Sequence, residues 1–211
     1  ESGAVAHYAS ELRSSLDVSS VSPIPVSAFN ILGLSNQDRQ HISEFLDNVN
    51  FGNSQNIISL STMYSDPSDE RINRTFKKFE KRQYSDLPPL MDLDMLGKDE
   101  KDLFDVINQI GREVSVGFPP ALLRGLARWP KLLPIIWNTL SMIDADGRLE
   151  QLKQKSRDEA FKNSSILASQ INRINRPEVG DQVLEQLKKL TQGGIPRALP
   201  VGLLLHKMLS K

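Results

Sequence analysis

Cysteine is absent from this chain of 211 residues, and its absence removes several chemistries at once. Without a thiol the chain has no disulfide framework, no CxxC redox motif, no cysteine nucleophile and no cysteine-based zinc site. The chain also lacks an excess of charge of either sign, since 26 basic side chains balance 26 acidic ones. A formal net charge of zero argues against non-specific nucleic-acid binding, which requires a basic surface.

Long apolar runs are missing as well. The longest candidate, residues 201–205, is far shorter than the roughly 20 residues that a membrane helix needs. The N-terminus does not show the basic, apolar and small-residue pattern of a signal peptide, so we expect a cytoplasmic protein without membrane contact. The chain opens at Glu1 rather than at a methionine, which leaves open that residues precede it. At this length we expect one or two domains and no need for a covalent staple.

Apolar residues recur at the spacing of an α-helix along most of the chain, which predicts an all-α fold. The two clearest stripes follow i, i+3, i+4, i+7 spacing and consist of Ile42, Phe45, Leu46 and Val49, then Leu103, Val106, Ile107 and Ile110. Ser35, followed by Asp38, fits the cap of the first stripe. A second long helix is expected from Asp146-Gly147 to about Asn175, before Arg176-Pro177.

Prolines set the other expected boundaries. Pro119-Pro120 and Pro130 each fit the first turn of a helix, where a missing N–H costs nothing. Residues 18–26 contain Pro23 and Pro25 and are interpreted as a loop. We expect residues 1–80 to form a partial helical repeat, residues 81–98 a linker and lead-in, and residues 99–211 a second helical repeat, together making one compact unit.

A weak internal repeat supports this division. An offset of 141 positions aligns Ile42 with Val183, Leu46 with Leu187, Val49 with Leu190 and Gly52 with Gly193. Each copy would be an apolar helix, a break at glycine and a further apolar helix. Units of this kind cannot bury an apolar face alone, so we expect the two copies to pack against each other. The alternative is that two amphipathic helices joined by glycine align this well by chance.

Three segments in order resemble the group I 2-haloacid dehalogenase family. They are Asn50-Phe51-Gly52-Asn53 with the apolar run after it, Leu87-Pro88-Pro89-Leu90-Met91-Asp92, and the segment from Leu126-Ala127-Arg128-Trp129-Pro130 to Leu133. The resemblance covers most of the chain at low identity. It implies an all-helical fold of two repeats about a pseudo-twofold axis, related to the alkylhydroperoxidase-D-like proteins. The first repeat would be truncated, and a homo-oligomer could cover the apolar surface left open.

The resemblance also implies a chemistry, and the residues of this chain depart from it. Those enzymes use an aspartate to activate water for direct attack, without an ester to the enzyme and without a cofactor or metal. Counting back seven residues from Trp129 places Leu122 where the family has that aspartate, and a leucine cannot accept a proton from water. Ala121 stands where the family has a serine. Peroxidase chemistry of the related proteins needs thiols, which this chain lacks.

Asn53 matches the family's active-site asparagine, although an N-cap of the helix that follows is the alternative interpretation. We therefore expect an altered relative without aspartate-dependent dehalogenation that binds a small apolar or anionic ligand. The alternative is a cofactor-independent hydrolytic 2-haloacid dehalogenase in which Glu113 or Asp92 reaches the pocket. The catalytic residues stay unknown, and the candidate ligand-binding residues are Asn50, Asn53, Leu122, Arg124 and Trp129.

Further motifs are interpreted as structural. The histidines His7, His41 and His206 have no helical pairing, so no metal site is expected. The segment Asp144-Ala145-Asp146-Gly147 fails the calcium-loop pattern and is interpreted as a turn with a helix cap. Asp92 with Asp94 and Gly193-Gly194 are interpreted as a lead-in and a helix-joining turn. Two pairs keep alternatives: Trp129 and Trp137 as core or as pocket lining, and Arg124 and Arg128 as solvated or as carboxylate-binding.

Overall fold

The protein is all-α in a computed structural model that describes residues 2–69, 76, 89–112, 120–170 and 180–210, and these residues contain no strand. The prediction of fold class is therefore confirmed. The α-helices are α1 (Ser2–Ser15), α2 (Val26–Ile31), α3 (Asn36–Thr62), α4 (Lys98–Gln109), α5 (Ala121–Leu126), α6 (Leu133–Ala145), α7 (Arg148–Gln170), α8 (Asp181–Lys189) and α9 (Ile195–Leu209). Short 3-10 helices are η1 (Leu93–Met95) and η2 (Pro130–Leu132), and η4 (Leu190–Gly194) is a π-helix.

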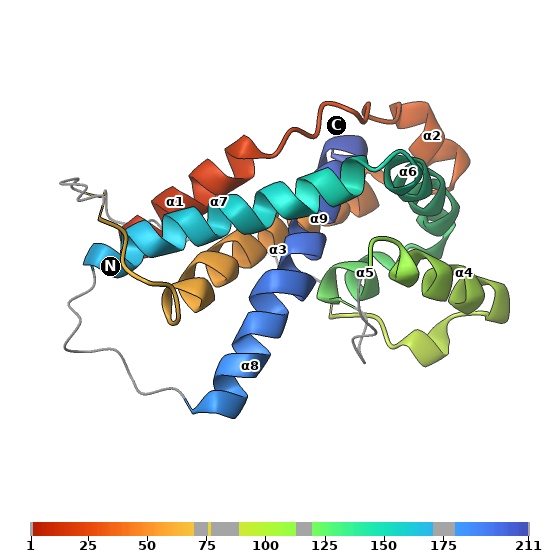
Figure 1. The fold of residues 1–211 in the computed structure, drawn as a ribbon. Helices are drawn as coiled ribbons and strands as arrows, with labels where there is room; N and C mark the ends of the chain where they lie inside the picture. Colours follow the sequence, from red (N-terminus) through yellow and green to blue (C-terminus); the bar gives the residue numbers. More distant parts are fainter. Residues whose placement is uncertain (1, 70–75, 77–88, 113–119, 171–179, 211) are drawn as a thin grey trace.

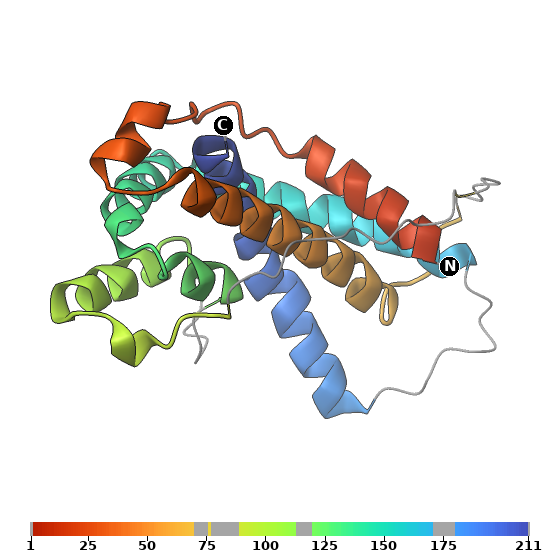
Figure 2. The same ribbon diagram turned by 180° about the vertical axis from the view of Figure 1, so that it is seen from behind.

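The two longest helices, α3 and α7, run side by side, and α1 lies along both of them (Figure 1). α9 packs against both α3 and α7, and its contact with α3 is the most extensive between any two described helices. The helices α4, α5 and α6 gather at one end of this bundle (Figure 2). None of the helices in the described part of the chain combines the length and the apolar character that a bilayer crossing requires.

The start of α3 follows the predicted cap. Asp38 donates its backbone N–H to the Ser35 hydroxyl at 3.1 Å, and the Asp38 carboxylate accepts from the Ser35 backbone at 2.8 Å. This reciprocal pair is a capping box, which satisfies two N–H groups that a helix end leaves open. The same carboxylate accepts from Trp129 Nε1 at 2.9 Å, so the cap also joins α3 to the chain segment before η2.

The predicted break at Gly52 is wrong. α3 continues without interruption from Asn36 to Thr62, so Gly52 lies in the interior of one helix. A single interior glycine costs about 1 kcal/mol relative to alanine. The apolar positions on both sides of Gly52, from Ile42 to Ile58, are buried in the common core and outweigh that cost. Asn53 is therefore interior to α3 and is not an N-cap.

Two glycines let helices cross closely. A Cβ at Gly202 of α9 would overlap the side-chain amide of Asn50 on α3, and a Cβ at Gly125 of α5 would overlap the ring of Phe45. Both glycines are buried. The absence of a side chain at these positions brings α9 and α5 into direct contact with α3, which fixes α3 at the centre of the fold.

The remaining boundaries agree in part with the sequence. Residues 18–25 form the predicted loop, which is tied to the end of α9 by the Ile24 N–H donating to the Met208 carbonyl at 3.0 Å. Pro130 begins η2, and α6 follows directly. α7 is described as far as Gln170, and the rest of its predicted span lies outside the described residues. The same holds for residues 81–88 of the expected linker.

Candidate functional site

The family-derived position Leu122 lies beside a very small cavity. Leu122 is 2% exposed, and the cavity has a volume of about 10 Å³, the space of a single water. Its described lining comprises Ile107, Ile110, Pro120, Leu122, Leu123, Leu140, Arg197, Ala198 and Val201. No carboxylate stands among these residues, so the part of the lining that the structure describes offers no base for water activation. Glu113, the acid considered as a substitute, lies outside the described residues.

Arg197 is the charged member of that lining, and its guanidinium is already engaged. Nε donates to the Ile110 carbonyl at 2.7 Å, and Nη2 donates to the Asn108 carbonyl at 2.9 Å. Burial, reinforced by the charge of Arg112, lowers the pKa of Arg197 to about 10. Arg197 therefore stays cationic near neutral pH, and it closes the end of α4 onto α9.

The other predicted ligand residues have separate partners. Asn50 is 2% exposed, and its amide lies against Gly202 with no hydrogen-bond partner among the described residues. Trp129 is buried and donates to Asp38. Arg124 donates to the Met91 carbonyl at 3.4 Å. Asn53 lies in the interior of α3. Of the five residues, Leu122 alone lines the small cavity, and none lines the larger groove described below.

The contacts of the arginine pair and the exposure of the tryptophan pair decide between the interpretations left open by the sequence. Arg128 donates to the Pro89 carbonyl at 2.9 Å, so Arg124 and Arg128 together hold the lead-in segment 89–91 rather than point freely into solvent. Trp137 is 42% exposed on α6, so the interpretation as core is correct for Trp129 and wrong for Trp137.

The interpretation of the two acidic motifs as structural agrees with their contacts, whereas Gly193-Gly194 lies in the π-helix η4 and does not form the expected helix-joining turn. Asp92 caps η1 by accepting from the Asp94 backbone at 3.2 Å, and Asp94 pairs with Lys101 at 3.1 Å. Asp146 accepts from the Arg148 backbone at 3.1 Å and pairs with the Arg148 side chain. Within the described ranges, no group of three potential metal-ligating side chains occurs.

A larger groove lies elsewhere, between α7 and the junction of α8 with α9. Its volume is about 520 Å³. One wall is a stripe on α7 with the i, i+3, i+4, i+7, i+8 spacing of one helix face. The opposite wall comes from the end of α3 and from η4. The lining residues are Gln154, Arg157, Asp158, Phe161 and Lys162 on the first wall, and Ser61, Tyr64, Thr191 and Gln192 on the second.

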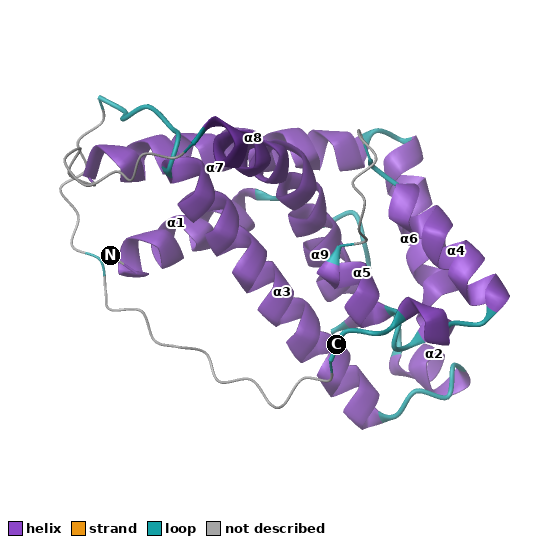
Figure 3. Ribbon diagram, turned by 90° about the horizontal axis from the view of Figure 1, so that it is seen from below, coloured by secondary structure: helices purple, strands orange, loops and turns teal. Residues whose placement is uncertain are grey.

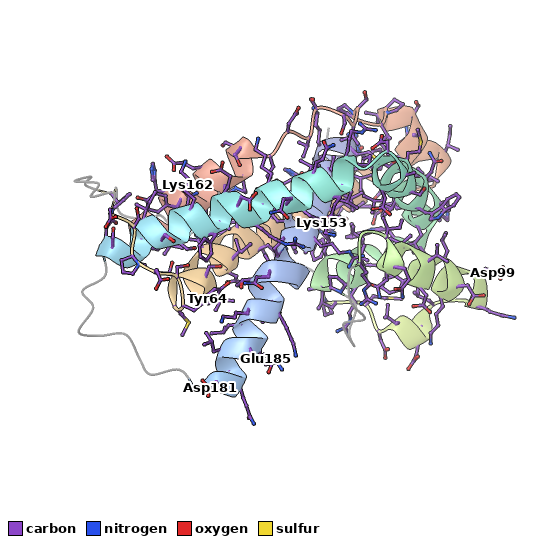
Figure 4. All side chains as sticks on the ribbon, in the orientation of Figure 1. Tyr64, Asp99, Lys153, Lys162, Asp181 and Glu185 are labelled. Carbon is purple, nitrogen blue, oxygen red and sulfur yellow. The ribbon has the colours of Figure 1, made fainter. Side chains whose placement is uncertain are left out.

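The second wall is organised by a chain of hydroxyl groups. Thr191 is buried and donates its one hydroxyl proton to the Leu187 carbonyl at 2.8 Å. The Tyr64 hydroxyl, 2.6 Å from Thr191 Oγ1, must therefore donate to it. Figure 4 shows Tyr64 beyond the end of α3, beside the upper end of α8. This bond joins α3 to the π-helix η4 and leaves the lone pairs of the Tyr64 oxygen as acceptors.

The π-helix also receives a contact from the first wall. Arg157 Nε donates to the Gln192 carbonyl in η4, and Nη1 donates to Gln154 Oε1 at 3.1 Å. A π-helix loosens the regular ladder of an α-helix, and such segments are often found at functional sites. The π-helix places the Gln192 carbonyl where Arg157 can donate to it. This hydrogen bond joins the two walls of the groove.

The electrostatics of the groove are weakly positive. Arg157 and Lys162 stand on either side of Phe161, which is 50% exposed although it is aromatic. Asp158 accepts from Gln154 Nε2 at 2.8 Å. Within the described chain, Lys162 has no ion-pair partner. Two cations and one carboxylate beside an open aromatic ring can hold an organic anion through both its charge and its apolar surface.

No protein-family model, no curated protein and no solved structure matches the chain. The likeness to 2-haloacid dehalogenases accordingly stays a prediction. Sequence reasoning missed the groove, although the spacing of the α7 stripe was visible. The stripe is mostly polar and is typical of a solvated helix face, and its partners Tyr64 and Thr191 are 127 positions apart.

Proposed function

We propose that the protein binds a small organic anion with an aromatic or apolar body in the groove between α7 and η4. The observation that carries the proposal is the exposed Phe161 ring set between Arg157 and Lys162 in a groove of about 520 Å³. The volume lies within the range of about 300 to 1,000 Å³ that is typical of ligand sites. The lining is more polar than usual for such sites and suits a charged ligand with one ring. The proposal keeps the small anionic ligand implied by the resemblance and assigns it to other residues.

In the proposed complex the ligand's ring lies against Phe161, and its carboxylate faces Lys162 and the outer edge of Arg157. Lys162 is the adaptable cation, because no described side chain already neutralises it. Arg157 is the less adaptable one, since its Nε is committed to Gln192. The Tyr64 oxygen can accept a hydrogen bond from a ligand hydroxyl, which would favour hydroxylated aromatic acids over plain ones.

Benzoate and benzamide provide a matched pair of probes, because they share a ring and differ in charge. We expect ligand-observed NMR to show benzoate bound and benzamide bound more weakly. Lys162→Gln should weaken benzoate binding by about fivefold, the size of one exposed charge contact, and Phe161→Ala should weaken both probes. Equal affinity for the two probes would contradict the proposal.

Lys155→Gln is the matched control for Lys162→Gln. Lys155 is an exposed lysine on the same helix that does not line the groove. We expect its replacement to leave benzoate binding unchanged at physiological salt, where screening suppresses distant charges. A loss as large as that of Lys162→Gln would mean that the anion responds to the general charge of α7.

The hydrolytic alternative has its own test. None of the described contacts brings a carboxylate to Leu122, and Asp92 is committed to its cap. We expect no chloride release from either enantiomer of 2-chloropropionate above the blank without protein. Release that a purified Asn53→Ala variant loses would instead establish the alternative that the resemblance implies.

A further inference from the structure

One helix carries an apolar stripe that the described residues cover only in part, since Leu187 at its centre is half-buried and its two ends are exposed. α8 projects from the bundle in Figure 1 and is seen nearly end-on against it in Figure 3. None of its residues is buried. Val183 is 55% exposed and Leu190, the next residue after α8, is 47% exposed. Together with Leu187 they follow the alternating four- and three-residue spacing of a coiled-coil seam.

The charges of α8 are distributed unevenly along its length. Asp181 stands at the start, Glu185 in the middle, and Lys188 and Lys189 at the end. Two such helices side by side in parallel would place the lysines of one copy against the lysines of the other. An antiparallel arrangement would place acidic residues against basic ones. The charge pattern therefore favours one orientation for self-association.

We propose that α8 is an interaction surface for a second copy of this chain, with the two α8 helices antiparallel about a twofold axis between residues 186 and 187. In this arrangement Val183 meets Leu190 of the second copy, and the Leu187 side chains of both copies meet near the axis. Within one copy Glu185 pairs with Lys189 at 2.7 Å, and Lys188 lies over the Tyr64 ring. In the proposed pair Glu185 additionally lies level with Lys188 of the second copy. A closed pair of this kind uses the same surface on both subunits.

The contact is limited to one helix of 9 residues per copy, which is small for a protein interface. Stable interfaces bury about 1,200 Å² or more in total, and smaller ones belong to transient complexes. The dimer therefore dissociates on dilution. The inference does not rest on the proposed ligand groove, since Val183, Leu187 and Leu190 do not line it.

The absence of cysteine makes cross-linking a clean test, because any introduced thiol is the only one in its chain. Val183→Cys and Leu190→Cys are prepared separately, oxidised alone and oxidised as a mixture. We expect the mixture to give a disulfide-linked dimer of one chain of each kind, while each variant alone gives little. Efficient linking of Val183→Cys to itself would mean a parallel pair and would overturn the proposal.

Charge exchange tests the same arrangement without a covalent bond. Glu185→Lys alone and Lys188→Glu/Lys189→Glu alone should each weaken self-association by about tenfold or more, because like charges then face each other. Mixing the two variants should restore association, measured by sedimentation over a range of concentrations. Circular dichroism checks that both variants keep the helical content of the parent chain.

A remote apolar replacement provides the control. Met142 is 61% exposed on α6, and Met142→Glu should leave sedimentation unchanged, whereas Leu187→Glu should give monomers. A parent chain that sediments as a monomer at every concentration, or equal effects of the two replacements, would overturn the assignment of α8 as the surface. Capture of a different protein by α8 while the chain itself stays monomeric would overturn it as well.

Discussion

Asp38 is the residue on which the start of α3 depends. It accepts from the Ser35 hydroxyl at 2.7 Å, from the Ser35 backbone at 2.8 Å and from Trp129 at 2.9 Å. These bonds hold the pKa of Asp38 below its usual value, with the Ser35 side chain making the largest contribution and Trp129 the next. The ionised carboxylate thus joins a helix cap to a buried tryptophan.

The lowered pKa of Asp38 predicts a specific pH dependence of stability. Because the pKa in the folded state lies below that of the unfolded state, the stabilisation is complete above about pH 4 and is lost as the pH falls through the folded pKa. Asp38→Asn should lower the free energy of unfolding at pH 7 by about 1 kcal/mol and flatten its dependence on pH below 4. Urea unfolding followed by tryptophan fluorescence measures both effects.

Asp105→Asn is the control for this prediction. Asp105 is exposed on α4 and has no contact with the cap of α3. Its replacement should change the free energy of unfolding by less than about 0.5 kcal/mol at either pH, as is usual for surface positions. Equal effects at Asp105 and Asp38 would show that the pH dependence does not arise at the cap.

The close contact between Gly202 and Asn50 is a second place where single residues determine stability. Gly202→Ala should destabilise the protein by about 1 to 3 kcal/mol, because the added methyl group overlaps the Asn50 amide in a packed crossing. Asn50→Ala removes an amide that has no described partner and opens that space, so the double variant should be more stable than Gly202→Ala alone. Chemical denaturation of the four proteins measures the coupling, and strict additivity would contradict the contact.

At the scale of elements, α3 shows which helix features follow from neighbouring residues and which follow from packing against distant parts of the chain. Ser35 and Asp38 predicted its start correctly, because a capping box is formed by residues three positions apart. Its continuity through Gly52 was mispredicted, because α1, α7 and α9, from other parts of the sequence, all pack against this helix. The interpretation of Asn53 as an N-cap was wrong for the same reason, because Asn53 lies inside the continuous helix.

Gly52 and Gly147 offer a paired test of this view. Neither has an atom within 4 Å of an added Cβ, but Gly147 has a φ of +78° and Gly52 has ordinary helical geometry. Gly52→Ala should raise the free energy of unfolding by about 0.5 to 1 kcal/mol, as expected for an interior helix position. Gly147→Ala should lower it by about 1 kcal/mol, because alanine is strained at positive φ.

Thermal or urea unfolding of both variants decides the point. If Gly52→Ala destabilises the protein as Gly147→Ala does, then Gly52 marks a real interruption of α3, and the original repeat interpretation regains its helix break. The reverse result means that one uninterrupted helix is the stable form in solution.

The groove could not be predicted from the sequence for a related reason. The stripe from Gln154 to Lys162 has one-sided helical spacing, but it resembles any solvated face until a second wall is known. That wall depends on the Tyr64–Thr191 hydrogen bond and on the π-helix, which place residues from distant parts of the chain together. The position Leu122, by contrast, was found through a resemblance and lies beside a cavity too small for a ligand.

At the scale of the whole molecule, the apolar core is continuous. A single cluster of buried residues extends from Ala4 in α1 to Leu209 in α9 and includes members of α4, α5 and α6. The linker expected near residues 81–98 does not divide this core, since Leu96 belongs to it. Among the described residues, segments on both sides of the expected linker share this core, and the division into two repeats stays a prediction.

A continuous core predicts cooperative unfolding. We expect a single calorimetric transition in which the measured enthalpy equals the enthalpy derived from the steepness of the transition. The experiment is performed at low protein concentration, so that self-association through α8 does not contribute. Two separable transitions would instead show that the segments before and after the linker unfold independently.

The position of α9 in the chain has a consequence for how the protein is made. During synthesis α3 and α7 leave the ribosome before α9, yet α9 supplies the most extensive contact to α3 among the described helices. Until α9 emerges, the surface of α3 that α9 covers is not yet buried. Long-range contacts of this kind slow folding. Completion of the core must therefore follow translation of the last described helix and cannot proceed stepwise with the growing chain.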